Sequence, residues 1–138
     1  MIQSISHIGI AVPDLKEATR FYTEILGLAI YGLEELPHYG VRMAFMPIGD
    51  ADFELELVTP TSRHSPVARF LARHGPGVQH VAYRVADVAT EFVRLKGMGV
   101  RMVGQEPRPG PHNTLCAFIH PKDAGGVLLE LVQDLEDD

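Results

Sequence analysis

One stretch of the chain occurs twice, and this repeat limits the folds that the chain can adopt. Residues 7–15 and 80–88 each begin with a histidine, continue as an apolar segment and reach an aspartate, at a constant offset of 73 residues. A second repeat, at an offset of 74, relates residues 54–58 to 128–132, with a glutamate in the middle of each. Because repeated supersecondary units pair to share a core, we expect two copies of one module.

Both copies are predicted to have the element order β-α-β-β-β. An aspartate begins the helix of each copy as its N-cap, Asp14 or Asp87, and a glycine ends each helix. Two further segments, 33–40 and 104–113, are rich in polar residues, Pro or Gly and are predicted as loops. The predicted strands cover 3–12, 28–32, 41–47 and 52–58 in the first copy and 79–85, 100–103, 114–119 and 127–132 in the second.

The 138 residues are expected to form one α+β domain, 1–138. Two such modules cannot each bury both faces of a sheet, so we predict that they pair into an incomplete curved barrel with the helices outside. Ser65 followed by proline is a strong helix start, so the segment between the copies is predicted to hold a helix. The expected parts are module 1 at 1–60, a linker helix at 61–77, module 2 at 78–133 and an acidic tail at 134–138.

Charge and cysteine content narrow the function classes. The net charge of −6 argues against a nucleic-acid surface. No apolar run approaches the roughly 20 residues of a membrane span, and the N-terminus shows no export signal, so we expect no membrane partner. Cys116 is the only cysteine, which excludes an internal disulfide and fits a reducing cytoplasm.

Each copy opens with a strand histidine and closes with a strand glutamate. On an extended chain His7 shares a face with Gly9 and Ala11, which leaves space in front of the imidazole. A single strand histidine is more often a hydrogen-bonded core residue than a ligand, and a glutamate between leucines can lie on a solvated face. The joint pattern favours a metal site instead, because pairing of the copies would bring two imidazoles and two carboxylates to one centre. The predicted ligands are His7, Glu56, His80 and Glu130.

Two nitrogen and two oxygen ligands suit a divalent ion of borderline softness. Co²⁺, Ni²⁺, Zn²⁺, Mn²⁺ and Fe²⁺ all fit, because this donor set does not select strongly among them. Four protein ligands argue against an Fe(II) oxygenase, whose usual set is two histidines and one carboxylate. An octahedral ion would keep two positions for substrate or water and could polarise a carbonyl as a Lewis acid.

Candidates for substrate binding are less sharply marked. His112 and His120 lie at loop–strand junctions, where they could bind substrate or cap turns, and Lys122 lies close by. Basic residues are available for a phosphate-bearing substrate, and each could equally be a solvated surface charge. These residues are Arg63, Arg69, Arg73, Arg108 and Lys122.

The duplicated module and its His…Glu…His…Glu set resemble the vicinal oxygen chelate superfamily. Within it, the chain is similar to the methylmalonyl-CoA epimerase family over nearly its whole length. The Ser-Pro helix and the segment from His120 to Glu130 are the more specific of the shared features. The stretches that carry the resemblance are 7–15, 56–60, 65–71, 80–85, 106–112 and 120–131.

The resemblance implies metal ligands at the four residues named above, an acyl-CoA substrate and a homodimer. It also implies an isomerase that moves the proton of the carbon between thioester and carboxylate and so interconverts (2R)- and (2S)-methylmalonyl-CoA. In that chemistry the metal stabilises an enolate, and Glu130 transfers the proton. We name His112, His120 and Lys122 as candidate substrate contacts.

The sequence departs from the epimerase pattern at one acid. Where a second glutamate on the third strand is one proposed base of the family, this chain has Met43, which cannot transfer protons. A bound water, Glu34, Glu35 and His112 remain as candidates for the second proton carrier. Two alternative functions stay open, a glyoxalase I-like isomerase (lactoylglutathione lyase) acting on thiol hemithioacetals and a metal-free binding protein of the same fold.

Overall fold

The computed structural model describes residues 1–49 and 52–136, so the last two residues of the predicted acidic tail lie outside the described residues. The chain divides into two compact units. The first unit comprises His7–Gln79, and the second comprises Met1–Ser6 together with His80–Asp138. Two long strands, β1 (Ile2–Ala11) and β5 (Gly77–Val85), each run along the chain from one unit into the other.

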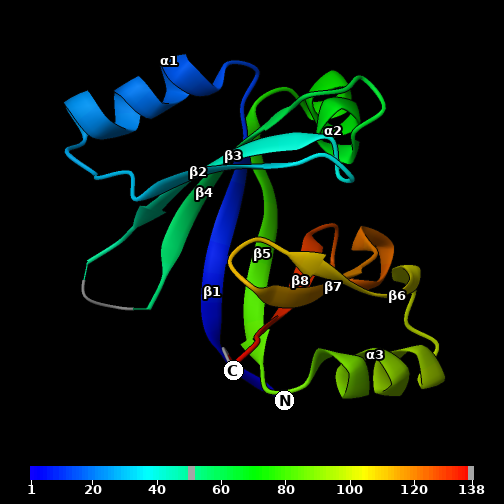
Figure 1. Cartoon of the computed structure of the whole chain (residues 1–138). Helices are drawn as coiled ribbons and strands as arrows, with labels where there is room; N and C mark the ends of the chain where they lie inside the picture. Colours follow the sequence, from blue (N-terminus) through cyan, green and yellow to red (C-terminus); the bar gives the residue numbers. More distant parts are fainter. Residues whose placement is uncertain (50–51, 137–138) are drawn as a thin grey trace. The chain divides into compact units, whose positions relative to one another are not determined.

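The first unit contains one half of the repeat. Its strands are ordered β2-β3-β4-β1, with β1 parallel to β4 and the other neighbours antiparallel. Its further elements are α1 (Leu15–Arg20), the π-helical turn η1 (Phe21–Ile25), β2 (Gly32–Leu36), β3 (Val41–Pro47), β4 (Glu54–Pro60) and α2 (Pro66–His74) (Figure 1).

The second unit has the same plan. Its strands are ordered β5-β8-β7-β6, with β5 parallel to β8 and the other neighbours antiparallel. The predicted β-α-β-β-β order of both copies is therefore confirmed. The further elements are α3 (Val88–Gly97), β6 (Met102–Gly110), β7 (Thr114–Ile119), the 3₁₀ turn η2 (Pro121–Asp123) and β8 (Leu128–Asp134) (Figure 1).

The helices begin where the sequence predicts. The side chain of Asp14 accepts a hydrogen bond from the backbone N–H of Glu17 at 3.1 Å, and Asp87 caps α3 in the same way. Ser65 caps α2 by accepting from the N–H of Val67 at 3.1 Å. The first helix differs in form, because it is α-helical only to Arg20 and continues as η1. Within residues 1–49 and 52–136, no helix is long and apolar enough to cross a membrane.

The second strand of the first copy differs from the prediction. Residues 28–31 form no strand, and β2 begins at the last residue of the predicted strand, Gly32, and continues to Leu36 in the segment 33–40 that was expected to be a loop. Glu34 and Glu35 have low strand propensity, which hid this strand. Antiparallel pairing with β3 outweighs that propensity, and charged residues are common on edge strands, where they discourage pairing with other chains.

The segment 104–113 is the second such difference. Most of it belongs to β6, which was expected to end at Val103. The pairing of β6 with β7 shifts register between Val103 and Arg108, as a bulge does. Proline is tolerated here because β6 is the last strand in the order and needs no donors on its outer side.

Apolar clusters cover both faces of the sheet in the first unit. On one face, Leu57 and Met46 pack with Leu15 and Ala18 of α1. On the other face, Met43, Phe45 and Val58 pack against α2 through Val67, Phe70 and Leu71. In the second unit, α3 packs through Val88 and Phe92 on Ala117 and Leu131. The strand faces are thus fixed by burial, which decides where each polar residue of a strand points.

Candidate metal centre

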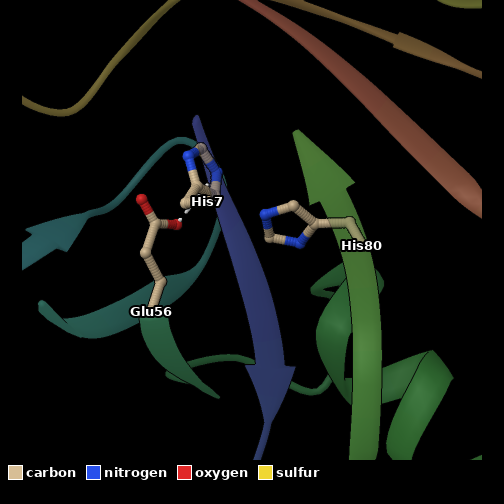
Figure 2. A group of neighbouring side chains, drawn as sticks. All are labelled: His7, Glu56 and His80. Carbon is tan, nitrogen blue, oxygen red and sulfur yellow. Dashed lines mark ion pairs between the residues drawn. The ribbon is translucent and has the colours of Figure 1, made fainter. Parts of the chain in front are cut away.

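The first unit pairs His7 with Glu56. In the parallel register of β1 and β4, Glu56 lies beside Gly9, two residues after His7, so both side chains belong to the same face. The Nε2 atom of His7 lies 3.3 Å from Oε2 of Glu56, the contact dashed in Figure 2. Both residues are buried, at 5% and 2% exposure.

The second unit pairs His80 with Glu130 by the same construction. Glu130 lies beside Ala82, two residues after His80, in the parallel register of β5 and β8. The Nε2 atom of His80 lies 3.5 Å from Oε1 of Glu130, and both residues are buried. The two copies of the repeat therefore produce two equivalent buried histidine–glutamate pairs.

The burial of the glutamates excludes the alternative that they lie on a solvated strand face. Glu130 is 6% exposed although leucines flank it, so it does not lie on a solvated face. A buried carboxylate costs several kcal/mol unless a cation or hydrogen-bond donors compensate it. A protonated imidazole or a metal ion could supply that compensation. A histidine that is protonated on both nitrogens cannot act as a metal ligand.

The donor set fits a divalent ion. Two atoms at about 2.1 Å from one ion and at right angles to each other are about 3 Å apart, close to the spacing of each pair. His7, Glu56 and His80 each offer one buried ligand atom to a metal ion. Imidazole nitrogens and carboxylate oxygens together suit borderline metals such as cobalt, nickel or zinc.

A phenylalanine flanks each glutamate, which the sequence reasoning missed. Phe45 on β3 is the register partner of Glu56, and Phe118 on β7 is the register partner of Glu130. The ring of Phe118 also meets the His80 ring edge-on, with centroids 6.1 Å apart. The two phenylalanines stand at the same 73-residue offset as the two histidines, so the repeat itself was the signal that could have found them.

Tyr31 is a second residue that the sequence reasoning missed. Its hydroxyl donates a hydrogen bond to Oε2 of Glu54 at 2.6 Å, and its ring stacks on Phe45 at 5.8 Å. Burial raises the pKa of the phenol well above its ordinary value, and the hydrogen bond to Glu54 and the charges of Glu54, Glu56 and Glu34 raise it further. The Tyr31 hydroxyl therefore stays neutral beside the Glu54 carboxylate.

The predicted substrate contacts lie in less buried surroundings. His120 uses its Nδ1 atom to accept from the N–H of Lys122 at 3.1 Å, so it caps the turn η2. His112 and Asn113 form the exposed β6–β7 hairpin with positive φ angles of 56° and 54°, a conformation that asparagine tolerates well. Met43 is buried at 6% exposure in the cluster against α2. The basic residues proposed for phosphates are all exposed: Arg63, Arg69, Arg73, Arg108 and Lys122.

Comparison with known proteins identifies the family. Residues 6–118 match the family described as Glyoxalase/Bleomycin resistance protein/Dioxygenase superfamily. The chain belongs to this superfamily. The chain is 38% identical to the mitochondrial methylmalonyl-CoA epimerase of Homo sapiens, over 94% of this chain and 73% of that protein. It is 37% identical to the ethylmalonyl-CoA/methylmalonyl-CoA epimerase of Cereibacter sphaeroides, over 96% of this chain and 99% of that protein.

Solved structures of this superfamily agree. A variant of the Streptomyces coelicolor methylmalonyl-CoA epimerase in complex with 2-nitronate-propionyl-CoA superposes with a TM-score of 0.93 at 37% identity, covering 99% of this chain and 100% of that chain. The predicted fold class and the resemblance to the methylmalonyl-CoA epimerases are confirmed. The expectation that the chain is an enzyme of the epimerase type is confirmed as well.

Proposed function

We propose that this chain interconverts (2R)- and (2S)-methylmalonyl-CoA by proton transfer at the α-carbon, at a divalent metal ion. The observation that carries the proposal is the pair of equivalent buried histidine–glutamate contacts, 3.3 Å and 3.5 Å long, in a chain whose relatives are epimerases. These contacts favour a metal site over the alternative of a metal-free binding protein, because small-molecule binding does not require two carboxylates buried beside two imidazoles.

The proposed ligands of the ion are His7, Glu56, His80 and Glu130. When bound, a divalent ion supplies Lewis acidity, which makes the α-proton of a coordinated thioester easier to remove. The mixed nitrogen and oxygen set does not select strongly among divalent ions, and Co²⁺ is the ion that we propose first. The other candidates are Ni²⁺, Zn²⁺, Mn²⁺ and Fe²⁺.

The protein's own residues would hold the donors in place and move the proton. The registers of the parallel strands orient each glutamate, and their register partners Phe45 and Phe118 would limit the access of water. Glu130 would accept the α-proton from one face of the substrate. Inversion then requires a proton from the opposite face, which a second group must deliver.

An acyl-CoA substrate is supported by the complex of the Streptomyces coelicolor relative with 2-nitronate-propionyl-CoA. His112, His120 and Lys122 remain proposed substrate contacts. The exposed arginines are proposed for the coenzyme phosphates, since guanidinium groups bind phosphate in a bidentate manner. A homodimer is proposed from the family resemblance, and a cytoplasmic location from the single buried thiol.

Deuterium exchange tests the proposed reaction. Purified protein loaded with Co²⁺ is incubated with each methylmalonyl-CoA epimer in deuterated water, with an enzyme-free blank. We expect inversion together with deuterium at the α-carbon. If methylglyoxal hemithioacetal is consumed instead and no deuterium enters methylmalonyl-CoA, the chain is a glyoxalase I-like isomerase and the proposal is wrong.

A substitution tests the role of Glu130. Glu130→Gln keeps the shape of the side chain but cannot accept the proton, so we expect loss of exchange and inversion by at least about 100-fold with the fold intact. Glu106→Gln, an exposed glutamate on β6, is the matched control and should keep full activity. A fully active Glu130→Gln enzyme would remove the residue from the mechanism.

A further inference from the structure

In this chain the residue at the position of the expected second acid is a methionine, Met43, which cannot transfer protons. Met43 is 6% exposed and packs in the apolar cluster with Phe45, Val58 and Val67. If the proposed epimerisation is right, another group must deliver the second proton. That group has to belong to the same face of the sheet as His7 and Glu56.

Glu34 meets this requirement by strand register. In the antiparallel pairing of β2 and β3, Glu34 is the direct partner of Met43, so the two side chains emerge on the same face with Cβ atoms about 5 Å apart. Leu36, two residues further along β2, packs against the same cluster as Met43, which fixes the face independently. Glu34 therefore places a carboxylate one strand away from the position where the acid is missing.

Tyr31, three residues before Glu34, contacts the strands next to Glu56. The backbone N–H of Tyr31 donates to the carbonyl oxygen of Phe45 on β3 at 3.0 Å. The hydroxyl itself is held by its hydrogen bond to Glu54 on β4, the strand of Glu56. The Tyr31 ring also stacks on Phe45, the register partner of Glu56. The segment that leads into Glu34 therefore packs next to the neighbours of Glu56 within the first unit.

The neighbouring candidates fit less well. Glu35 alternates to the opposite face, is exposed and forms an ion pair with Arg42. His112 is exposed at the tip of the β6–β7 hairpin. Glu34, by contrast, is half-buried on the face of the ligands. A half-buried carboxylate keeps access to solvent for proton exchange while it faces the substrate side.

We propose that Glu34 is the second proton carrier of the epimerase, in place of the acid that Met43 lacks; this inference rests on the proposed function. The α-carbon's C–H bond breaks as its proton passes to Glu130, and the electron pair moves toward the thioester oxygen. The O–H bond of protonated Glu34 then breaks, and a new C–H bond forms on the opposite face as the electron pair returns to carbon. Exchange with water returns Glu130 and Glu34 to their starting protonation states, and the reverse reaction uses the two acids in the opposite order.

The test compares Glu34→Gln with Glu35→Gln, its exposed neighbour on the same strand. Each Co²⁺-loaded variant is incubated with each epimer in deuterated water, and inversion and α-deuterium are measured separately. For Glu34→Gln we expect inversion to fall at least about 100-fold. Deuterium should still enter one epimer without inversion, because Glu130 can remove and return a proton on its own face. Glu35→Gln should behave as the parent protein.

The outcomes separate this inference from the proposed function. Parent protein that neither inverts nor exchanges either epimer removes the proposed function, and the inference falls with it. Glu34→Gln that inverts at the parent rate refutes Glu34 alone and leaves the proposed function standing. Loss of exchange in both epimers also refutes the inference if the variant keeps the parent's Co²⁺-induced rise in melting temperature, because Glu34 would then position the whole substrate.

Discussion

Replacing Glu56 by glutamine should remove nearly all of the stability that a bound divalent ion gives this protein. An ion present at 100 times its dissociation constant stabilises the folded state by about 2.7 kcal/mol. For a domain of this length, 1 kcal/mol corresponds to a shift of about 3–5 °C in melting temperature, so the parent protein should gain roughly 8–13 °C on addition of Co²⁺. Gln at position 56 leaves a weak neutral donor, and the gain should fall below about 2 °C.

The metal-free proteins should behave differently. Glu56 is 2% exposed, and a buried carboxylate is costly when no metal compensates it. Metal-free Glu56→Gln should therefore melt at no lower temperature than the metal-free parent. The matched control is Glu54→Gln, two residues earlier on β4, which keeps an oxygen for the Tyr31 hydroxyl and should keep the full metal response.

The assay is thermal unfolding with a chelator and with increasing Co²⁺, applied to single substitutions of all four proposed ligands. One shared ion predicts that each substitution removes almost the whole gain, because an ion that loses one of four ligands binds far more weakly. Two independent half-sites predict that each substitution removes about half. A full gain in Glu56→Gln, or no gain in the parent protein, would refute the proposed site.

Three further outcomes test the packing and electrostatics. Leu57→Ala should lower the free energy of unfolding by about 2–5 kcal/mol in urea titrations, because Leu57 is fully buried, whereas Leu33→Ala on the exposed edge strand should stay within about 0.5 kcal/mol. Ser65→Ala should cost about 1 kcal/mol, since it removes the N-cap of α2, and a change below about 0.3 kcal/mol would contradict that role. The hydrogen bonds from Arg101 lower the pKa of Asp123 from 3.8 to about 2, so the contribution of this pair is present above about pH 4 and lost as the pH falls through 2. The stability difference between the parent and Asp123→Asn should therefore close over that range in acid titrations of the melting temperature, and a difference that is unchanged at pH 2 would contradict the ion pair.

The repeat predicted the two histidine–glutamate pairs because it places the same residue types at equivalent positions of two strands in both copies. His7 and Glu56 share a face only if the register of β1 and β4 is offset by an even number of residues, and the same holds for His80 and Glu130. The sequence cannot supply that offset from one copy. Two copies with nearly equal spacings made a chance arrangement less plausible, and the same comparison could have identified Phe45.

The edge strands could not be predicted, for a physical reason. β2 and β6 contain residues that disfavour strands, such as Glu34 and Pro107. They form because the neighbouring strand has backbone N–H and C=O groups that would otherwise be unpaired. Local propensity does not contain that information. The error had a consequence for the site, because a loop over 33–40 leaves the face of Glu34 undefined, whereas the register of β2 defines it.

The parallel pairings also set the order in which each site can assemble during folding. β4 and β8 each pair with the preceding strand through a connection shorter than a module, so Glu56 meets Phe45 and Glu130 meets Phe118 early. His7 and His80 reach their glutamates only after a whole module has closed, and such distant pairing is slow. A metal ion that needs both partners would bind after the main folding barrier, so it would slow unfolding and leave the folding rate nearly unchanged.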